Sequence, residues 1–266
     1  MTNAEDLTLA LRLADEADRI SLDRFGSADL KIESKPDLTP VSDADLAVER
    51  AIRAVLEAER PGDAVIGEEY GASAVGESAR PRRWVVDPID GTKNFVRGVP
   101  VWATLIALFD GDEIVVGVVS APALSRRWWA ATGSGAFSTF QGGPARRIAV
   151  SGVSALEDAS LSYSDLSEWE AIGKLEEFVG LTRRCWRTRG YGDFYSYMLV
   201  AEGAADIATE PELNLWDVAA LVPIVREAGG TFTGIDGGAA GPATASALVT
   251  NSHLHAEVLR ALTTGS

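Results

Sequence analysis

The chain has 266 residues, 46% of them hydrophobic and 24% charged, which argues against disorder and fits one large domain or two small ones. Its 24 lysine and arginine residues stand against 39 aspartate and glutamate residues, a net charge of −15 at pH 7. That charge repels nucleic-acid phosphates and anionic membranes, so we expect neither as a partner. A small anionic substrate would also be repelled, unless a bound cation reversed the local charge.

The single cysteine, Cys185, excludes an intrachain disulfide and a cysteine-based zinc or iron–sulfur site. The N-terminal residues lack the basic and apolar regions of a secretion signal. The apolar run 101–109 is much shorter than the roughly 20 residues that cross a bilayer. We therefore expect a cytoplasmic protein.

The first half of the chain predicts two helices followed by a run of strands. Apolar residues recur at helical spacing over 7–20, and Gly26 is placed to end that helix. Ser42, with Asp45 three residues later, is typical of the N-cap of a second helix that runs to about Arg60. Short apolar runs then predict strands, joined in one case by a hairpin turn at 110–112, over 64–67, 84–86, 103–109, 114–119 and 127–131.

The second half alternates helices and strands more evenly, after a glycine-rich segment over 133–143. We place a soft boundary near residue 145, which gives subdomains 1–145 and 146–266. Pro223 lies inside one helical pattern and should kink it. Helices are predicted over 169–179, 194–202, 218–228 and 255–262, and strands near 148–150, 161, 206–208, 231 and 247–250. This order favours layers of helices and sheets over a regular βαβ repeat.

The segment Trp84-Val85-Val86-Asp87-Pro88-Ile89-Asp90-Gly91-Thr92-Lys93-Asn94-Phe95 carries the strongest candidate site. A buried strand runs directly into Asp87 and Asp90, and Pro88 fixes the backbone between them so that both carboxylates can face one point. The carbonyl of Ile89 can face the same point. Three oxygen donors within four residues form the ligand set that magnesium prefers.

The next two residues suit a phosphate. Gly91 permits a tight turn, and the amide groups of Gly91 and Thr92 would lie free at the start of a helix. The alternative is a simple turn in which Asp87 and Asp90 hydrogen-bond the local backbone.

Two further acidic elements could complete this site. Glu68 and Glu69 follow directly after a predicted strand, and Asp217 stands at a predicted helix start, where the alternative role is an ordinary N-cap. Two carboxylates about 4 Å apart repel each other by roughly 4 kcal/mol at an effective dielectric constant near 20. A cluster of this kind persists at neutral pH only if cations neutralise it or some members are protonated. Divalent ions would also make an acidic cleft attractive to an anion.

Three motifs and their order identify a family. They are Gly67-Glu68-Glu69, Asp87-Pro88-Ile89-Asp90-Gly91-Thr92 and Trp216-Asp217-Val218-Ala219-Ala220, with Glu227-Ala228-Gly229-Gly230 after the last. Together they resemble the inositol monophosphatase superfamily of magnesium-dependent, lithium-sensitive phosphatases, and the resemblance covers nearly the whole chain. It implies an α+β or α/β layered sandwich (αβαβα) with two subdomains, and a homodimer. Segments 35–41, 91–102 and 189–194 look most like the histidinol-phosphatase branch, which serves histidine biosynthesis.

The resemblance implies two or three Mg²⁺ ions per subunit. The first two would be held by Glu68, Asp87, the carbonyl of Ile89, Asp90 and Asp217, and a third, weaker one by Asp37 and Asp43. For the last two, an ordinary loop carboxylate and a first-turn helix aspartate are the alternatives. Water oriented by Glu68 and Thr92 would attack phosphorus, with Asp90 holding the ion that stabilises the leaving alkoxide.

The implied substrate contacts are Asp90, Gly91, Thr92, Lys93, Arg189, Asp193, Glu210 and Asp217. Histidinol carries an ammonium and an imidazole, so a carboxylate-lined pocket formed by Asp193 and Glu210 would suit it. Arg189 would contact the substrate or pair with one of these acids. The alternatives are a helix N-cap for Asp193, a loop acid for Glu210 and a surface cation for Arg189.

We therefore expect a magnesium-dependent phosphomonoesterase that acts on L-histidinol phosphate. Lys93 stands where inositol-type members more often carry a small hydroxyl residue, which makes inositol-1-phosphate the runner-up. Fructose 1,6-bisphosphate and phosphoadenosine phosphates are more distant alternatives. A different class, a non-catalytic partner of transcription machinery, fits less well because the acidic metal set is complete.

Overall fold

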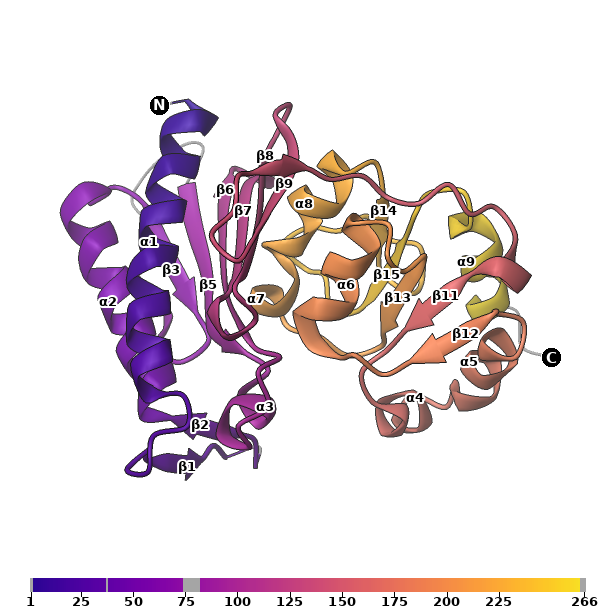
Figure 1. Ribbon diagram of the computed structural model, residues 1–266, viewed down its shortest axis with the longest axis horizontal. Helices are drawn as coiled ribbons and strands as arrows, with labels where there is room; N and C mark the ends of the chain where they lie inside the picture. The colour runs from indigo at the N-terminus through magenta and orange to yellow at the C-terminus, as the bar shows by residue number, and fades with distance from the viewer. Residues whose placement is uncertain (1, 37, 74–81, 264–266) are drawn as a thin grey trace.

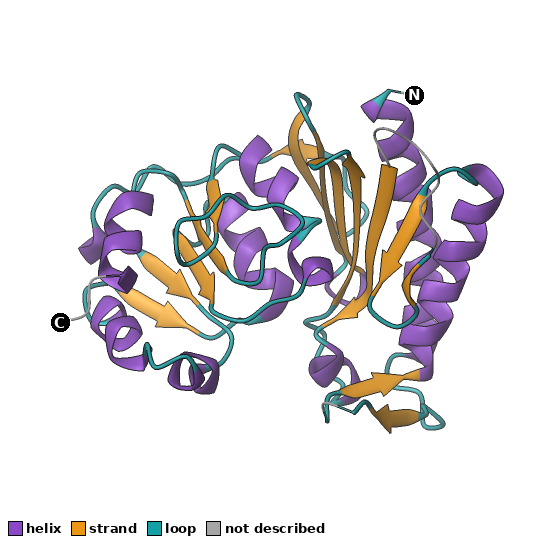
Figure 2. Cartoon of the chain, turned by 180° about the vertical axis from the view of Figure 1, so that it is seen from behind, coloured by secondary structure: helices purple, strands orange, loops and turns teal. Residues whose placement is uncertain are grey.

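The computed structural model describes residues 2–36, 38–73 and 82–263. Five layers follow one another across the molecule: helices, an eight-stranded sheet, helices, a five-stranded sheet and helices (Figure 1). The expected αβαβα sandwich is therefore confirmed. The view from behind shows the same two sheets, separated by helices (Figure 2).

The first layer consists of α1 (Asn3–Arg24) and α2 (Asp43–Glu59), which pack on one face of the eight-stranded sheet. Both helices begin with a capping box, and in α2 this is the Ser42–Asp45 pair predicted from the sequence. The sheet has the order β10-β9-β8-β7-β6-β5-β3-β4 and is antiparallel except between β3 and β5. Its strands are β3 (Ala64–Gly67), β4 (Gly71–Ala72), β5 (Arg82–Asp90), β6 (Ala103–Asp110), β7 (Glu113–Ala121), β8 (Arg126–Ala131), β9 (Gly135–Phe140) and β10 (Arg146–Arg147).

The middle layer separates the two sheets and supplies part of the site. It contains α6 (Asp193–Ala201), α7 (Leu215–Val218) and α8 (Leu221–Glu227). The second sheet has the order β12-β11-β13-β15-β14, and helices α4 (Leu166–Ala171), α5 (Leu175–Thr182) and α9 (His255–Thr263) cover its outer face. Its strands are β11 (Ser160–Ser162), β12 (Arg187–Arg189), β13 (Ile207–Glu210), β14 (Thr231–Thr233) and β15 (Ala247–Thr250).

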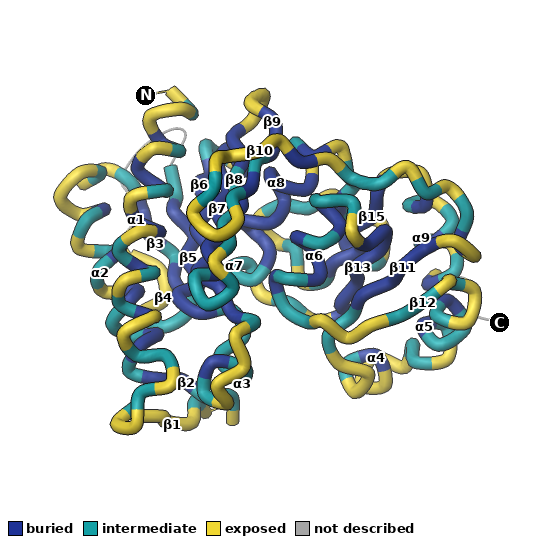
Figure 3. The backbone as a smooth tube through the Cα atoms, in the orientation of Figure 1, coloured by how far each residue is buried: buried dark blue, intermediate teal, exposed yellow. Residues whose placement is uncertain are grey.

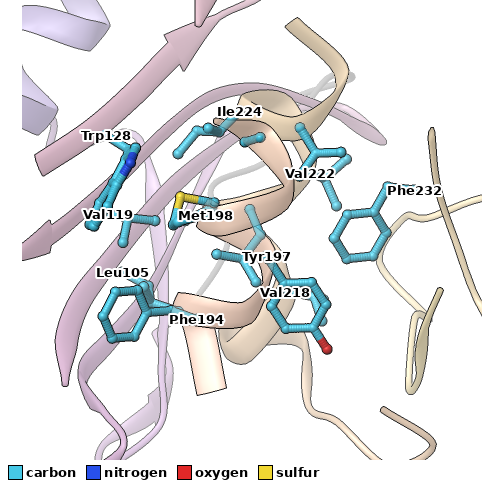
Figure 4. Packing of buried hydrophobic residues seen from close by; sticks show 14 of the residues in the cluster. Leu105, Val119, Trp128, Phe194, Tyr197, Met198, Val218, Val222, Ile224 and Phe232 are labelled. Carbon is cyan, nitrogen blue, oxygen red and sulfur yellow. The ribbon is translucent and has the colours of Figure 1, made fainter. Parts of the chain in front are cut away.

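The largest hydrophobic cluster joins both sheets through this middle layer. Phe194, Tyr197 and Met198 of α6 pack with Val119 and Trp128 of the first sheet (Figure 4). The cluster draws on residues on both sides of position 145, and buried segments lie in both sheets and in the helices between them (Figure 3). Among the described residues, no helix is both long and apolar enough to cross a membrane.

Several predicted elements differ from those observed. Strands β1 (Ile32–Ser34) and β2 (Pro40–Ser42) were not predicted; they pair as a hairpin on either side of the connection 35–39. The helix predicted over 169–179 is divided into α4 and α5. Gly173, with a φ of +70°, follows the end of α4 and breaks the helix there. No strand forms at 148–150. The strand in this region is β10, which occupies the two preceding residues and pairs there with β9.

Pro223 interrupts its helical segment as expected. The interruption falls at Ala219 and Ala220, between α7 and α8, which is where the carbonyl four residues before a proline loses its donor and meets the ring. The segment starts at Leu215, three residues earlier than predicted. This early start places Asp217 in the first turn of α7, on the side of the first sheet.

The close contact between β7 and α8 generates a stability prediction. A Cβ atom on Gly117 would lie 2.2 Å from the carbonyl oxygen of Ala220 and 2.6 Å from Cγ of Pro223. Gly117→Ala should therefore lower the free energy of unfolding by about 1–3 kcal/mol, measured by urea denaturation. Gly180→Ala is the control, because nothing lies within 4 Å of its added Cβ and it sits within α5. Equal effects of the two substitutions would contradict this packing.

Candidate active site

The buried strand β5 ends in the two aspartates of the central motif. The register between β5 and β6 shifts between Asp87 and Asp90, so the chain bulges at this point. Oδ1 of Asp87 accepts a hydrogen bond from the amide of Ile89 at 2.9 Å, and the hydroxyl of Thr104 donates to the carbonyl of Pro88 at 2.8 Å. These contacts fix the segment that carries the two carboxylates.

A third carboxylate comes from α7. Oxygen atoms of Asp87, Asp90 and Asp217 all lie within 4.8 Å of one another. Oδ2 of Asp217 accepts from the amide of Asn214 at 2.6 Å, and Oδ2 of Asp90 accepts from the amide of Phe194 at 2.7 Å. The predicted cluster of these three acids is present, and the N-cap region of α7 positions its third member.

The raised pKa values of the three aspartates indicate a site that favours a cation. Burial, followed by the charges of Glu68 and Asp90, raises the pKa of Asp87 well above its ordinary value. Burial, followed by the charges of Asp193 and Asp217, does the same to the pKa of Asp90. Burial raises the pKa of Asp217 to about 6. Desolvated oxygen donors that repel one another fit a hard divalent ion such as Mg²⁺.

Glu68 faces the same cavity beside the three aspartates. Nζ of Lys35, from the connection between β1 and β2, lies 2.6 Å from Oε1 of Glu68 and 2.7 Å from Oε1 of Glu69. These hydrogen bonds raise the pKa of Lys35 although its burial acts in the opposite direction. Burial also raises the pKa of Glu69 to about 7. Lys35 was not predicted as a site residue.

Thr92 begins the short helix α3 (Thr92–Val96), after Gly91 with a φ of +85°. Its Oγ1 lies 3.0 Å from the carbonyl oxygen of Ile89 and 3.3 Å from Oδ1 of Asp45. Asp45 is buried, and burial raises its pKa to about 6. The sequence showed Asp45 only as a capping residue. Asp45 both caps α2 and contacts Thr92, because its other oxygen accepts from the amide of Ser42 at 2.8 Å.

The site opens into a cavity of about 770 Å³ between the two sheets. Gly91, Thr92 and Lys93 line it near the aspartates. Within the described part of the chain, five further acids line its remaining wall: Asp165, Glu168, Asp193, Glu210 and Glu212. Three of them, at 165, 168 and 212, were not predicted, since nothing distinguishes them in sequence from other solvated acids.

Asp193 and Glu210 both lie in this cavity. Glu210 is only 4% exposed at the end of β13, so it is not a loop acid; its Oε1 accepts from the Tyr197 hydroxyl at 2.8 Å, and burial raises its pKa to about 8. Asp193 follows the N-cap residue Gly192, so it is not the cap. Its Oδ2 accepts from Nδ2 of Asn94 at 2.9 Å, and burial raises its pKa to about 6 against the opposing charge of Lys93.

Two other predicted residues, Arg189 and Asp43, do not line this cavity. Arg189 is exposed on edge strand β12, and its guanidinium donates to the neighbouring carbonyl of Thr188 at 2.7 Å instead of pairing with an acid of the cavity. Asp43 forms an ion pair with Arg24 at 2.9 Å, because the first position of α2 points toward the end of α1. Asp37 lies outside the described residues.

The raised pKa values generate a pH prediction for the metal-free chain. The folded state binds more protons than the unfolded state between about pH 4 and pH 8, so stability should fall as pH rises through this range. Melting temperatures in EDTA should therefore decrease from pH 5 to pH 8, and added Mg²⁺ should restore them. Asp217→Asn should melt at least about 2 °C above the unsubstituted chain in EDTA at pH 8. A lower melting temperature for this variant would show that the carboxylates do not strain the fold.

Comparisons with known proteins agree with this geometry. The sequence profile of the inositol monophosphatase family matches residues 2–265, and members of that family depend on metal ions. The chain is 58% identical to a histidinol-phosphatase of Mycobacterium tuberculosis, over 98% of this chain and 99% of that protein, and 58% identical to one of Streptomyces coelicolor, over 96% of each. The crystal structure of the extragenic suppressor protein suhB of Bartonella henselae superposes with a TM-score of 0.89 at 30% identity, covering 98% of this chain and 100% of that one. The chain belongs to the inositol monophosphatase family.

Proposed function

We propose that this chain is a magnesium-dependent phosphomonoesterase that hydrolyses L-histidinol phosphate to L-histidinol and phosphate, in histidine biosynthesis. The observation that carries the substrate is the acidic wall of the cavity, with Asp193, Glu210 and Glu168 beyond the aspartate cluster. High identity over nearly the whole length to two proteins named histidinol-phosphatases supports the same substrate.

We assign two ions to oxygen donors of the described residues. Glu68, Asp87 and the carbonyl of Ile89 would hold one Mg²⁺, and Asp87, Asp90 and Asp217 would hold the other. When bound, these ions would neutralise the substrate phosphate and lower the pKa of a coordinated water. We do not assign Asp43 to a third ion, because its carboxylate is paired with Arg24.

The chain's own groups orient the reactants. Glu68 and the Thr92 hydroxyl would align the attacking water with phosphorus. Oδ1 of Asp45, 3.3 Å from Oγ1 of Thr92, can accept a hydrogen bond from the threonine hydroxyl, which leaves the Thr92 oxygen free to accept a hydrogen bond from water. The amides of Gly91 and Thr92 and the ammonium of Lys93 would bind the phosphate oxygens.

The acidic wall suits a cationic alcohol. Glu210 and Asp193 are desolvated acids, and Oε2 of Glu168 is buried with no hydrogen-bond partner among the described residues. The ammonium and imidazole of histidinol would supply donors and positive charge to these carboxylates. The neutral hydroxyls of inositol would not compensate the repulsion among these carboxylates. The geometry therefore favours histidinol phosphate over inositol-1-phosphate, and no separate observation favours fructose bisphosphate, phosphoadenosine phosphates or a transcription partner.

A substrate panel tests this function directly. With Mg²⁺, we expect kcat/KM for histidinol phosphate to exceed that for inositol-1-phosphate at least about tenfold, measured as released phosphate. The same enzyme should complement a histidine auxotroph that lacks this phosphatase. Asp90→Asn, which replaces a metal ligand, should lose roughly 100-fold or more in kcat and fail to complement. Faster turnover of inositol-1-phosphate would refute the substrate assignment.

Substitution in the acidic wall tests how the alcohol is recognised. Glu210→Gln keeps an acceptor for the Tyr197 hydroxyl but cannot ionise when a cation binds beside it, so KM for histidinol phosphate should rise about tenfold or more. The KM for p-nitrophenyl phosphate, which has no cation, should change less than twofold. The control is Glu170→Gln, an exposed acid on α4 that does not line the cavity. Equal KM effects on both substrates would show that Glu210 does not recognise the cation.

We also infer a cytoplasmic homodimer with no nucleic-acid or membrane partner. The net charge of −15 supports the exclusion of nucleic acid. Sedimentation of the purified chain would decide the oligomeric state.

A further inference from the structure

The turn that carries Glu68 lies on a buried carboxylate of α2. The side chain of Glu49 is 0% exposed. Its Oε2 accepts from the amide of Glu69 at 2.7 Å, and its Oε1 accepts from the amide of Tyr70 at 3.2 Å. Burying a carboxylate costs several kcal/mol of free energy unless the group is paired and hydrogen-bonded. A buried carboxylate with these partners is therefore expected to have a specific role.

Arg53, one helical turn after Glu49, completes the arrangement. Its Nε donates to Oε1 of Glu49 at 2.7 Å, and its Nη2 donates to the carbonyl of Gly71. The ion pair thereby contacts the turn at the two amides that follow Glu68 and at the carbonyl of Gly71. From the cavity side, Lys35 holds the side chains of Glu68 and Glu69.

Gly67 shows how closely the turn approaches this carboxylate. A Cβ atom at this position would lie 2.0 Å from Oε1 of Glu49. Gly67 pairs in register with Val86 of β5, and the amide of Glu68 donates to the Val86 carbonyl at 3.3 Å. Asp87 directly follows Val86. The distance between the Glu49 carboxylate and the backbone of the turn therefore sets the position of Glu68 relative to the aspartate cluster.

We propose that Glu49 is a positioning residue for the metal site. It holds the backbone of residues 68–70 so that the Glu68 carboxylate faces the same point as Asp87. The inference rests on the proposed function in one respect, that Glu68 is a metal ligand. It predicts that loss of the Glu49 carboxylate weakens metal binding even though Glu49 itself contacts no ion.

The test is calorimetric titration of the full chain with Mn²⁺, without substrate. Glu49→Gln places an amide N–H group against the donors of the turn or of Arg53, and should weaken Mn²⁺ binding by about 10–100-fold. Glu57→Gln removes the same charge from an exposed position of α2 and should leave the affinity unchanged. Thermal unfolding in EDTA checks that both variants are folded.

A second variant displaces the carboxylate without changing its charge. The Cβ of Gly67→Ala must push Glu49 off the turn, so this variant should weaken Mn²⁺ binding to a similar degree. The double variant should bind about as well as the weaker single variant, since both changes break one contact. If Glu49→Gln does not fold, Gly67→Ala alone decides.

Mn²⁺ affinity within twofold of the unsubstituted chain, in a folded Glu49→Gln or Gly67→Ala variant, would overturn the proposal. So would additive effects of the two changes. Hydrolysis of histidinol phosphate by the unsubstituted chain is measured separately. If that activity is absent while the variants still lose Mn²⁺ affinity, the substrate assignment fails and the role of Glu49 stands.

Discussion

Mutual repulsion among three carboxylates is the constraint around which this structure is arranged. Asp87 and Asp90 lie at the end of strand β5 in the first sheet, and Asp217 approaches them from the middle layer of helices. Neither layer would place these groups together on its own. The hydrophobic cluster that joins both sheets therefore holds the acids near one another, and a bound divalent ion would relieve the repulsion that packing creates.

The same cavity uses acidic side chains for two different purposes. The aspartate cluster suits metal ions and, through them, a phosphate, whereas the wall with Asp193, Glu210 and Glu168 suits a cationic alcohol. A substrate with an anionic end and a cationic end fits both regions. This explains how a chain with a net charge of −15 can bind a phosphate ester.

The sequence predicted the part of the site that is local. Asp87, Ile89 and Asp90 lie on one short segment whose spacing and proline limit its conformation, and family motifs added Glu68 and Asp217. Long-range choices were harder. Asp43 and Asp45 are two residues apart on one helix, and only the packing of α1 against α2 turns Asp43 to Arg24 and Asp45 to Thr92.

Other residues lacked a sequence signal altogether. Glu168 on α4 resembles any exposed helical acid in sequence, yet it lines the cavity. Arg189 was predicted to contact the substrate or pair with an acid of the cavity, but it lies exposed on edge strand β12. The fold followed the same division. The two N-terminal helices and strands β3, β5, β6, β7 and β8 were predicted, whereas the β1–β2 hairpin, β9, β10 and β12 were not, because they depend on pairing partners that a linear pattern does not contain.

The most direct measurement is anomalous X-ray scattering from crystals of this protein grown with Mn²⁺. We expect anomalous peaks within coordination distance of Asp87, Asp90 and Asp217, with Glu68 turned from Lys35 toward one of them. A well-ordered cavity with no peak among these carboxylates, at a Mn²⁺ concentration that supports full activity, would contradict it.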